Sequence, residues 1–286
     1  MQPANDGSRR EKRKERLERQ AVEIKQRLSH IQHKIMVMSG KGGVGKSSVS
    51  TYLAVALSKR NYRTGLLDVD LHGPSILRLL GWRGTLRESD RHGKLQPIGY
   101  RPNLEVMSIE ALATNKDAAT IWRGPMKGAA IRQFIADINW AAMDFMIIDA
   151  PPGTGDEPLT VAQTIPDALA LIVTTPQEIS LADVRKSIDF CRQVDMTILG
   201  LVENMSGLIC PHCGETIHLF KNRGGAMSAS KENLRLLATL PFDLEVVLRG
   251  DDGDVGILDD HRRPITQAFD AMVDKIVALT VNVVTP

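Results

Sequence analysis

The apolar residues of this chain gather in short continuous runs, and between them apolar positions recur with helical spacing. The runs expected to form strands span residues 34–39, 64–69, 104–109, 144–149, 168–174 and 197–203, with 236–241 as the last. Helices are expected between them, notably at 46–60, 125–138, 181–194 and 261–279. Continuous apolar strands that alternate with helices indicate a parallel sheet buried on both faces. The pattern predicts an α/β fold with a doubly wound, mostly parallel sheet and helices on both faces.

A charged segment precedes the first of these runs. Residues 11–31 are expected to form a helix with one narrow apolar stripe. The stripe consists of Leu17, Ala21, Ile24, Leu28 and Ile31. We expect the helix to pack on the domain or to remain solvated, and a partner-binding arm is the alternative. The chain is thus divided into a helical N-terminal extension, residues 1–33, and one domain, residues 34–280.

Charge and cysteine content narrow the classes of function. Residues 1–34 contain ten Lys and Arg against five Asp and Glu, whereas residues 160–286 contain eleven against seventeen. The basic excess lies mostly in the N-terminal tail and the C-terminal half is acidic, which argues against a broad nucleic-acid-binding face on the domain. Three cysteines are too few for a disulfide framework. The chain begins with polar residues and contains no run of about 18 apolar residues, so we expect a cytoplasmic protein with no membrane partner.

A glycine-rich loop follows the first apolar run and leads into a helix. It consists of Gly40, Lys41, Gly42, Gly43, Val44, Gly45, Lys46, Ser47 and Ser48. The glycines let backbone N–H groups converge on phosphate oxygens, and the N-terminus of the helix adds partial positive charge. Lys46 is expected to neutralise the β and γ phosphates, and Ser47 to ligate Mg²⁺. The loop therefore predicts an ATP site.

Lys41 lies near the start of this loop, where ordinary Walker A sequences have no fixed cation. Its position resembles the deviant Walker A class, which includes MinD, ParA and the nitrogenase iron protein. The resemblance implies an ATP-dependent dimer in which Lys41 reaches the phosphates bound by the other subunit. A cation supplied in this way would stabilise transition-state charge only when the dimer closes.

Acidic residues at strand ends are expected to complete the nucleotide site. Asp68 and Asp70 end the strand after the loop helix, at the sheet edge where α/β proteins bind ligands. We expect Asp70 to orient the attacking water. Asp149 ends a later strand and is expected to hold Mg²⁺ through water as the Walker B carboxylate. Residues 151–156 suit a switch loop that senses the γ phosphate, and the Asn204 amide matches an adenine edge.

A C-x-x-C motif, formed by Cys210 and Cys213, lies a few residues after Asn204, the predicted adenine contact. A closed tetrahedral metal site needs about four ligands, and the motif supplies two thiolates. Cys191 lies in a predicted helix and is expected to be a buried apolar residue. The pair could bind zinc with His212 or His218, act as a redox dithiol, or join the same motif of a second subunit. A two-fold dimer would bring two further thiolates for a [4Fe–4S] cluster.

From Lys34 to about Leu279 the chain resembles the Mrp/ApbC family of iron–sulfur carrier ATPases. The matching runs are SGKGGVGKSS, LLDVDLHGPS, WRGPM, DFMIIDAPPGTGDE, VTTPQE, ENMSGLICPHCG and LPFD, in the expected order. The resemblance implies that a labile [4Fe–4S] cluster is held on a homodimer or related heterodimer and is passed to apo-proteins, with ATP bound and hydrolysed.

The resemblance also implies roles for individual residues. Cys210 and Cys213 would bridge the cluster within a metal loop at residues 205–225, and Asn204 would contact the adenine. Pro241, in the LPFD run, would be a further nucleotide contact. The catalytic residues would be Lys41, Lys46 and Asp70. Some relatives carry four cysteines for a further cluster, or a small acidic domain, ahead of the loop, and residues 1–33 match neither.

Two other functions remain open. A spatial-organising ATPase of the MinD or ParA type would bind membrane or DNA, but residues 265–284 contain Lys275 as their only basic residue. A zinc-stabilised regulatory ATPase would use the same thiols for a structural metal. Analysis of the bound metal distinguishes the zinc hypothesis from the iron–sulfur hypothesis.

Overall fold

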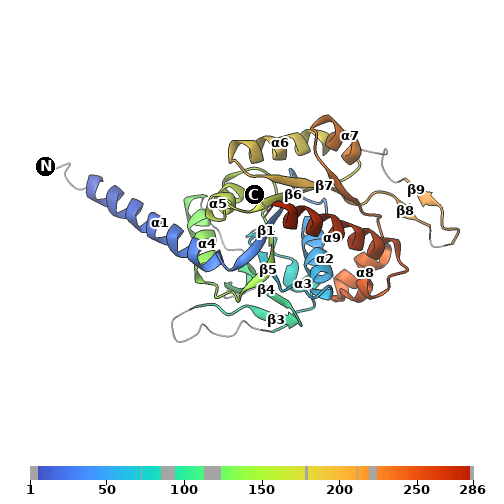
Figure 1. The fold of residues 1–286 in the computed structure, drawn as a ribbon, viewed down its shortest axis with the longest axis horizontal. Helices are drawn as coiled ribbons and strands as arrows, with labels where there is room; N and C mark the ends of the chain where they lie inside the picture. The colour runs from blue at the N-terminus through green and yellow to red at the C-terminus, as the bar shows by residue number, and fades with distance from the viewer. Residues whose placement is uncertain are drawn as a thin grey trace.

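The computed structural model describes residues 6–71, 73–84, 94–112, 124–177, 180–210, 212–218 and 224–283. These residues form an eight-stranded sheet with the strand order β10-β7-β6-β1-β5-β2-β4-β3, covered by helices (Figure 1). Its neighbouring strands run parallel apart from β3, which pairs antiparallel with β4. The predicted fold class, a mostly parallel α/β sheet preceded by an N-terminal helix, is confirmed.

The described strands agree closely with the apolar runs. In the main sheet they are β1 Ile31–Met38, β2 Thr64–Asp68, β3 Ile98–Arg101, β4 Leu104–Ser108, β5 Met143–Asp149, β6 Leu169–Thr174, β7 Ile198–Glu203 and β10 Leu236–Thr239. A separate two-stranded hairpin consists of β8 Leu208–Ile209 and β9 Thr216–Ile217. The antiparallel edge strand β3 and the hairpin were not predicted, because four-residue and two-residue strands carry little periodicity.

The helices divide between the two faces of the sheet. They are α1 Asp6–Leu28, α2 Lys46–Lys59, α3 Ile76–Leu79, α4 Gly124–Asp137, α5 Asp156–Thr164, α6 Ser180–Gln193, α7 Gly224–Lys231, α8 Leu244–Asp252 and α9 Pro264–Val283, with short 3₁₀ segments η1 Ile109–Leu112 and η2 Gly256–Asp259. Successive strand residues point to opposite faces, so Val37 packs in a core with α2 and α9, whereas Met38 packs in a core with α4, α5 and α6. The sheet is therefore buried on both sides.

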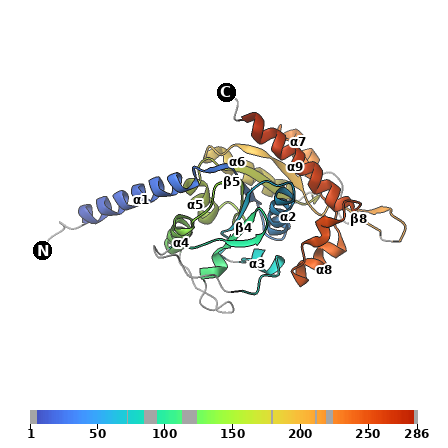
Figure 2. The ribbon, with the colours of Figure 1, turned by 60° about the horizontal axis from the view of Figure 1, so that its bottom comes forward.

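The first helix ends earlier than its apolar stripe predicted. It stops at Leu28, and Ile31 already belongs to β1. Ile24 and Leu28 are buried in the core next to α4, whereas Ala21 is exposed. Figure 2 shows the N-terminal part of α1 extending away from the body. The expected packing on the domain thus holds for the last two turns of the helix.

The first strand also begins before the predicted Lys34. The polar residues in that stretch gave no apolar run to predict its start. Lys34 is nevertheless buried, and its Nζ donates to the Ile31 carbonyl over 3.0 Å and to Asp167 over 2.7 Å.

The last helix begins at Pro264 instead of His261, as expected for a proline in the first helical turn. Within the described part of the chain, no helix is long and apolar enough to span a membrane.

Candidate functional site

The glycine-rich loop connects β1 to α2, as the sequence predicted, and its backbone requires glycine. Gly43 and Gly45 both have φ of 78°, in the left-handed region. A Cβ at Gly45 would lie 2.3 Å from Nδ2 of Asn204. That amide donates to the Val44 carbonyl over 2.9 Å. The loop is therefore shaped as a cradle of backbone groups at the N-terminus of α2, which fits a phosphate.

Asp149 joins the polar side chains at the base of this cradle. It is fully buried at the end of β5. Lys46 Nζ lies 2.7 Å from its Oδ1, and Ser47 Oγ donates to its Oδ2 over 2.6 Å. Ser50 Oγ, which the sequence analysis missed, donates to Oδ1 over 2.8 Å. Ser50 lies one helical turn after Lys46, and that spacing could have identified it.

Asp68 and Asp70 lie beside this group, since β2 pairs with β5 and Asp68 is in register with Asp149. Asp68 accepts hydrogen bonds from Ser108 Oγ over 2.9 Å and from the backbone N–H of Asp70 over 3.1 Å. Burial and then the nearby charge of Asp149 raise the pKa of Asp68. Asp70 Oδ2 lies 3.9 Å from Lys46 Nζ. The structure thus brings the predicted acids together around Lys46.

Lys41 lies at the opening of the loop, next to the connection between β6 and α6. Its Nζ donates to Oε1 of Gln177 over 3.4 Å, a partner that the sequence analysis did not identify. The Gly153 N–H donates to the Ser39 carbonyl over 2.8 Å. The predicted switch loop is therefore hydrogen-bonded to the start of the phosphate loop.

Pro241 follows β10 in a segment that pairs with the chain after β7. The Ser206 N–H donates to the Leu240 carbonyl over 2.8 Å, and the Phe242 N–H donates to the Gly207 carbonyl over 2.8 Å. This pairing brings Pro241 to the same edge of the sheet as the chain after β7. A cavity of about 490 Å³ lies beside the segment. Its lining includes Leu208, Ile209, Pro241, Phe242 and Leu244.

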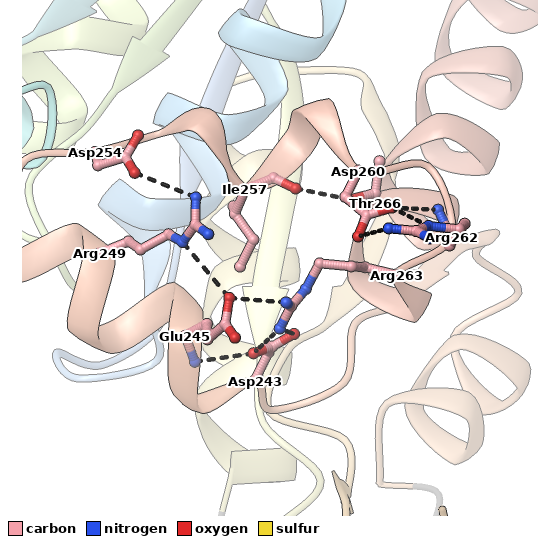
Figure 3. A network of polar contacts seen from close by, with 9 residues as sticks. All are labelled: Asp243, Glu245, Arg249, Asp254, Ile257, Asp260, Arg262, Arg263 and Thr266. Atoms are coloured by element: carbon pink, nitrogen blue, oxygen red, sulfur yellow. Dashed lines mark hydrogen bonds and ion pairs between the residues drawn. The ribbon is translucent and has the colours of Figure 1, made fainter. Parts of the chain in front are cut away.

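Arg263, the residue directly before α9, anchors this segment (Figure 3). Arg263 Nη2 lies 3.0 and 2.9 Å from the two oxygens of Asp243, and its Nη1 lies 2.7 Å from Glu245. Asp243 also caps α8 by accepting from the Glu245 N–H over 2.9 Å. Arg249 extends the network to Glu245 and Asp254. These contacts could not be predicted from the sequence, because Arg263 and Asp243 are 20 positions apart.

The thiol pair lies on the β8–β9 hairpin. The Cys210 N–H donates to the Glu215 carbonyl and the Gly214 N–H to the Cys210 carbonyl, both over 2.9 Å. Cys210 is partly exposed and Cys213 is exposed. The backbone N–H of Cys213, followed by that of His212, lowers the pKa of the Cys210 thiol. Hydrogen bonding thus favours the thiolate, which is the metal-binding form of cysteine.

The remaining cysteine has different surroundings. Cys191 is buried in α6 with its Sγ 3.5 Å from the Met38 sulfur, and burial raises its pKa to about 12. It packs as a buried apolar residue, as predicted. Among the described residues, no group of three or more His, Cys, Asp or Glu side chains is arranged to hold a metal ion. Pro211, between the two thiols, lies outside the described residues.

A family model that matches most of the chain identifies the family of this protein. A family described as NUBPL iron-transfer P-loop NTPase, of the ParA group, matches residues 30–277. The chain belongs to this family. The resemblance seen in the sequence motifs is thereby confirmed, since these iron-transfer P-loop NTPases include relatives named as iron–sulfur carriers.

Among the relatives of this NTPase is the iron-sulfur cluster carrier protein of Methanocaldococcus jannaschii. It is 40% identical over 265 residues, which cover 92% of this chain and 90% of the relative. The cytosolic Fe-S cluster assembly factor NUBP2 homolog of Dictyostelium discoideum is 47% identical over 227 residues, 76% of this chain and 83% of the relative.

Solved structures agree with the fold of the NTPase. A nucleotide-binding protein from Archaeoglobus fulgidus in complex with ADP has a TM-score of 0.73 and 38% identity, covering 86% of this chain and 94% of that chain. The cell division ATPase MinD of Pyrococcus furiosus has a TM-score of 0.60 and 21% identity, covering 87% and 100%. The likeness to MinD concerns the fold alone.

Proposed function

We propose that this NTPase binds and hydrolyses ATP and carries an iron–sulfur cluster, as its cargo, to apo-proteins. The observation that carries the proposal is one shared sheet edge. Asn204 contacts the phosphate loop there, and the thiols of Cys210, which is partly exposed, and Cys213, which is exposed, follow it on a short hairpin. Relatives of similar length are named as iron–sulfur cluster carriers, which supports the same cargo for this chain.

The phosphate loop would bind the nucleotide. Its backbone N–H groups and Lys46 would bind the phosphates, and Ser47 would ligate Mg²⁺ with Asp149 acting through water. The polar side chains fit this assignment, because Lys46 and Ser47 both contact the buried carboxylate of Asp149. Bound Mg²⁺ would neutralise charge on the phosphates. Asp70 would orient the attacking water, since it lies within 3.9 Å of Lys46 at the same strand ends.

The adenine would lie against Asn204 and Pro241. Asn204 comes directly after β7, and the backbone next to Pro241 pairs with the segment that follows it. The two residues therefore lie on adjoining segments at one edge of the sheet. We propose that residues 34–280 form the ATPase domain, with the metal loop at 205–225 and residues 1–33 as an extension.

A cluster would require a second subunit. Two thiolates per chain supply half of the ligands of a [4Fe–4S] cluster, so a homodimer or related heterodimer would complete the set. In the same dimer Lys41, at the opening of the phosphate loop, would reach the nucleotide of the partner. Relatives named as cytosolic assembly factors support a cytoplasmic location.

Anaerobic reconstitution with iron and sulfide tests the cargo. The expected product has a broad absorbance near about 400 nm and about four irons per dimer, and it transfers its cluster to an apo-[4Fe–4S] enzyme. Cys210→Ala or Cys213→Ala should abolish it, whereas the control Cys191→Ala, in the core, should retain it. Stoichiometric zinc that resists exchange with iron would instead identify a zinc-stabilised ATPase.

A further inference from the structure

Glu203, at the end of β7, is a buried carboxylate outside the proposed nucleotide and thiol sites. Its exposed fraction is 3%. Strand residues alternate between faces, so Glu203 points to the same side as Leu201, whose core includes Ala229 of α7. A buried carboxylate is costly unless it accepts hydrogen bonds. The hydrogen-bond donors to Glu203 therefore identify the segments that this carboxylate positions.

Two donors among the described residues come before and after the cysteine hairpin, residues 208–217, in the chain. Before the hairpin, Ser206 Oγ donates to Oε1 of Glu203 over 2.6 Å. After it, the Gly225 N–H in the first turn of α7 donates to Oε2 over 2.6 Å. Both are short bonds to an ionisable acceptor, which are stronger than neutral ones. One carboxylate thus binds both the segment before the thiol pair and the helix α7 after it.

The approach of α7 to Glu203 depends on small residues. A Cβ at Gly225 would lie 2.8 Å from Oε2 of Glu203, and one at Gly224 would lie 2.5 Å from the Pro176 carbonyl. Pro176 immediately precedes Gln177, the partner of Lys41. The start of α7 is therefore held between Glu203 and the connection that contacts the phosphate loop.

The strand end itself is attached to the nucleotide side. Asn204, the next residue, donates its amide to Val44 of the phosphate loop. The Glu203 carbonyl accepts from the Leu240 N–H over 2.7 Å, next to Pro241. A shift of Asn204 on nucleotide binding would therefore be passed to the hairpin through Glu203.

We propose that Glu203 is a positioning residue that couples the nucleotide site to the thiol pair. Its carboxylate binds Ser206, two residues before the cysteine hairpin, and Gly225, in the helix that follows it, to the strand end that carries Asn204. The biological meaning of this coupling rests on the proposed function. The order of the hairpin and its response to nucleotide are measurable without any iron in the protein.

The test uses the full chain without metal, with and without saturating ADP. Hydrogen exchange reports the order of residues 205–225, and maleimide labelling reports the thiols of Cys210 and Cys213. In the wild-type protein, ADP should change the labelling rate by about fivefold. In Glu203→Ala, exchange at the Ser206 and Gly225 amides should be about tenfold faster, and the ADP effect should disappear.

Further variants separate positioning from general destabilisation. Glu203→Gln should restore both readouts, because its carbonyl can accept from Gly225 and its amide can donate to Ser206 Oγ. Ser206→Ala, a milder change, carries the test if Glu203→Ala does not fold, and should lose part of the ADP effect. Glu232→Ala is the control, since Glu232 follows α7 and pairs with Arg192 at 3.3 Å. It should behave as wild type.

Each outcome decides the proposal. An ADP effect that persists in folded Glu203→Ala and Ser206→Ala, or that is missing in the wild-type protein, would overturn the coupling. Equal loss of the effect in Glu232→Ala would also overturn it. Failure of the wild-type protein to bind a cluster, with the labelling pattern as expected, would contradict the carrier function and leave the role of Glu203 intact.

Discussion

At the residue scale, the buried acids of the nucleotide site differ in how their charge is compensated. Asp149 contacts a lysine and two serine hydroxyls. Asp68 is equally buried, and its hydrogen-bond donors are a hydroxyl and a backbone N–H. The ionised form of Asp68 is therefore the more costly of the two, which agrees with its raised pKa.

This difference predicts a pH dependence of stability. Because the folded-state pKa of Asp68 is raised, the folded protein binds that proton more tightly than the unfolded chain. Above the ordinary aspartate pKa of about 4, Asp68 therefore lowers the free energy of unfolding as pH rises. Asp68→Asn removes this term, so its stability relative to wild type should increase from about pH 5 to about pH 8. Urea unfolding of both proteins measures it, and a difference that stays constant with pH would contradict the prediction.

At the scale of elements, the N-terminus of α8 is held by a contact with Arg263, the residue that precedes α9. Asp243, two residues after Pro241, is both the N-cap of α8 and the ion-pair partner of Arg263. The arginine side chain is 25% exposed, so solvent screens these ion pairs in part. The network nevertheless restricts the segment that would contact the adenine.

Replacing this arginine tests the link between helix packing and nucleotide binding. Arg263→Ala should lower the free energy of unfolding by about 1 kcal/mol and weaken ADP binding severalfold, because Asp243 loses its partner. The neighbouring Arg262→Ala is the matched control, since Arg262 is fully exposed and pairs with Asp260 in the same loop. Its stability and ADP affinity should equal those of wild type. Urea unfolding and calorimetric titration measure both, and equal effects of the two substitutions would refute the link.

At the scale of the whole molecule, the proposed function depends on two chains. Lys41 lies at the opening of the phosphate loop, with Gln177 as a hydrogen-bond partner. The thiols lie on a hairpin that separates from the main sheet. Both features present reactive groups at the surface, where a second subunit would complete the cluster site and the nucleotide site together.

Lys41→Ala therefore has an expected signature. ATP binding by each chain should stay within severalfold of wild type, whereas ATP-dependent dimerisation should be lost and hydrolysis should fall at least about a hundredfold. Lys46→Ala, in contrast, should lose nucleotide binding itself. Sedimentation with ATP and phosphate release measure the two effects. Unchanged hydrolysis by a monomeric Lys41→Ala protein would show that the lysine acts within its own chain.

Local patterns along the chain were enough to predict several features. Continuous apolar runs predicted the central strands, because a strand buried on both faces admits few polar residues. The glycine loop, Lys46 and Ser47 could be placed because phosphate loops combine fixed spacing with a strand-to-helix context. Asp68, Asp70 and Asp149 could be expected to meet, since parallel strands end at one edge of the sheet.

Contacts between distant segments were decided by the tertiary structure. Lys34 of β1 pairs with Asp167, and Asp243, next to the Pro241 segment, pairs with Arg263. The hydrogen bond from Gly225 to Glu203 requires that α7 packs against the end of β7. No spacing in the sequence encodes such pairs, because their partners meet only after the sheet has formed. The fold class and the phosphate loop could be predicted from local patterns alone, whereas the attachment of the thiol hairpin to them depends on how strands and helices pack.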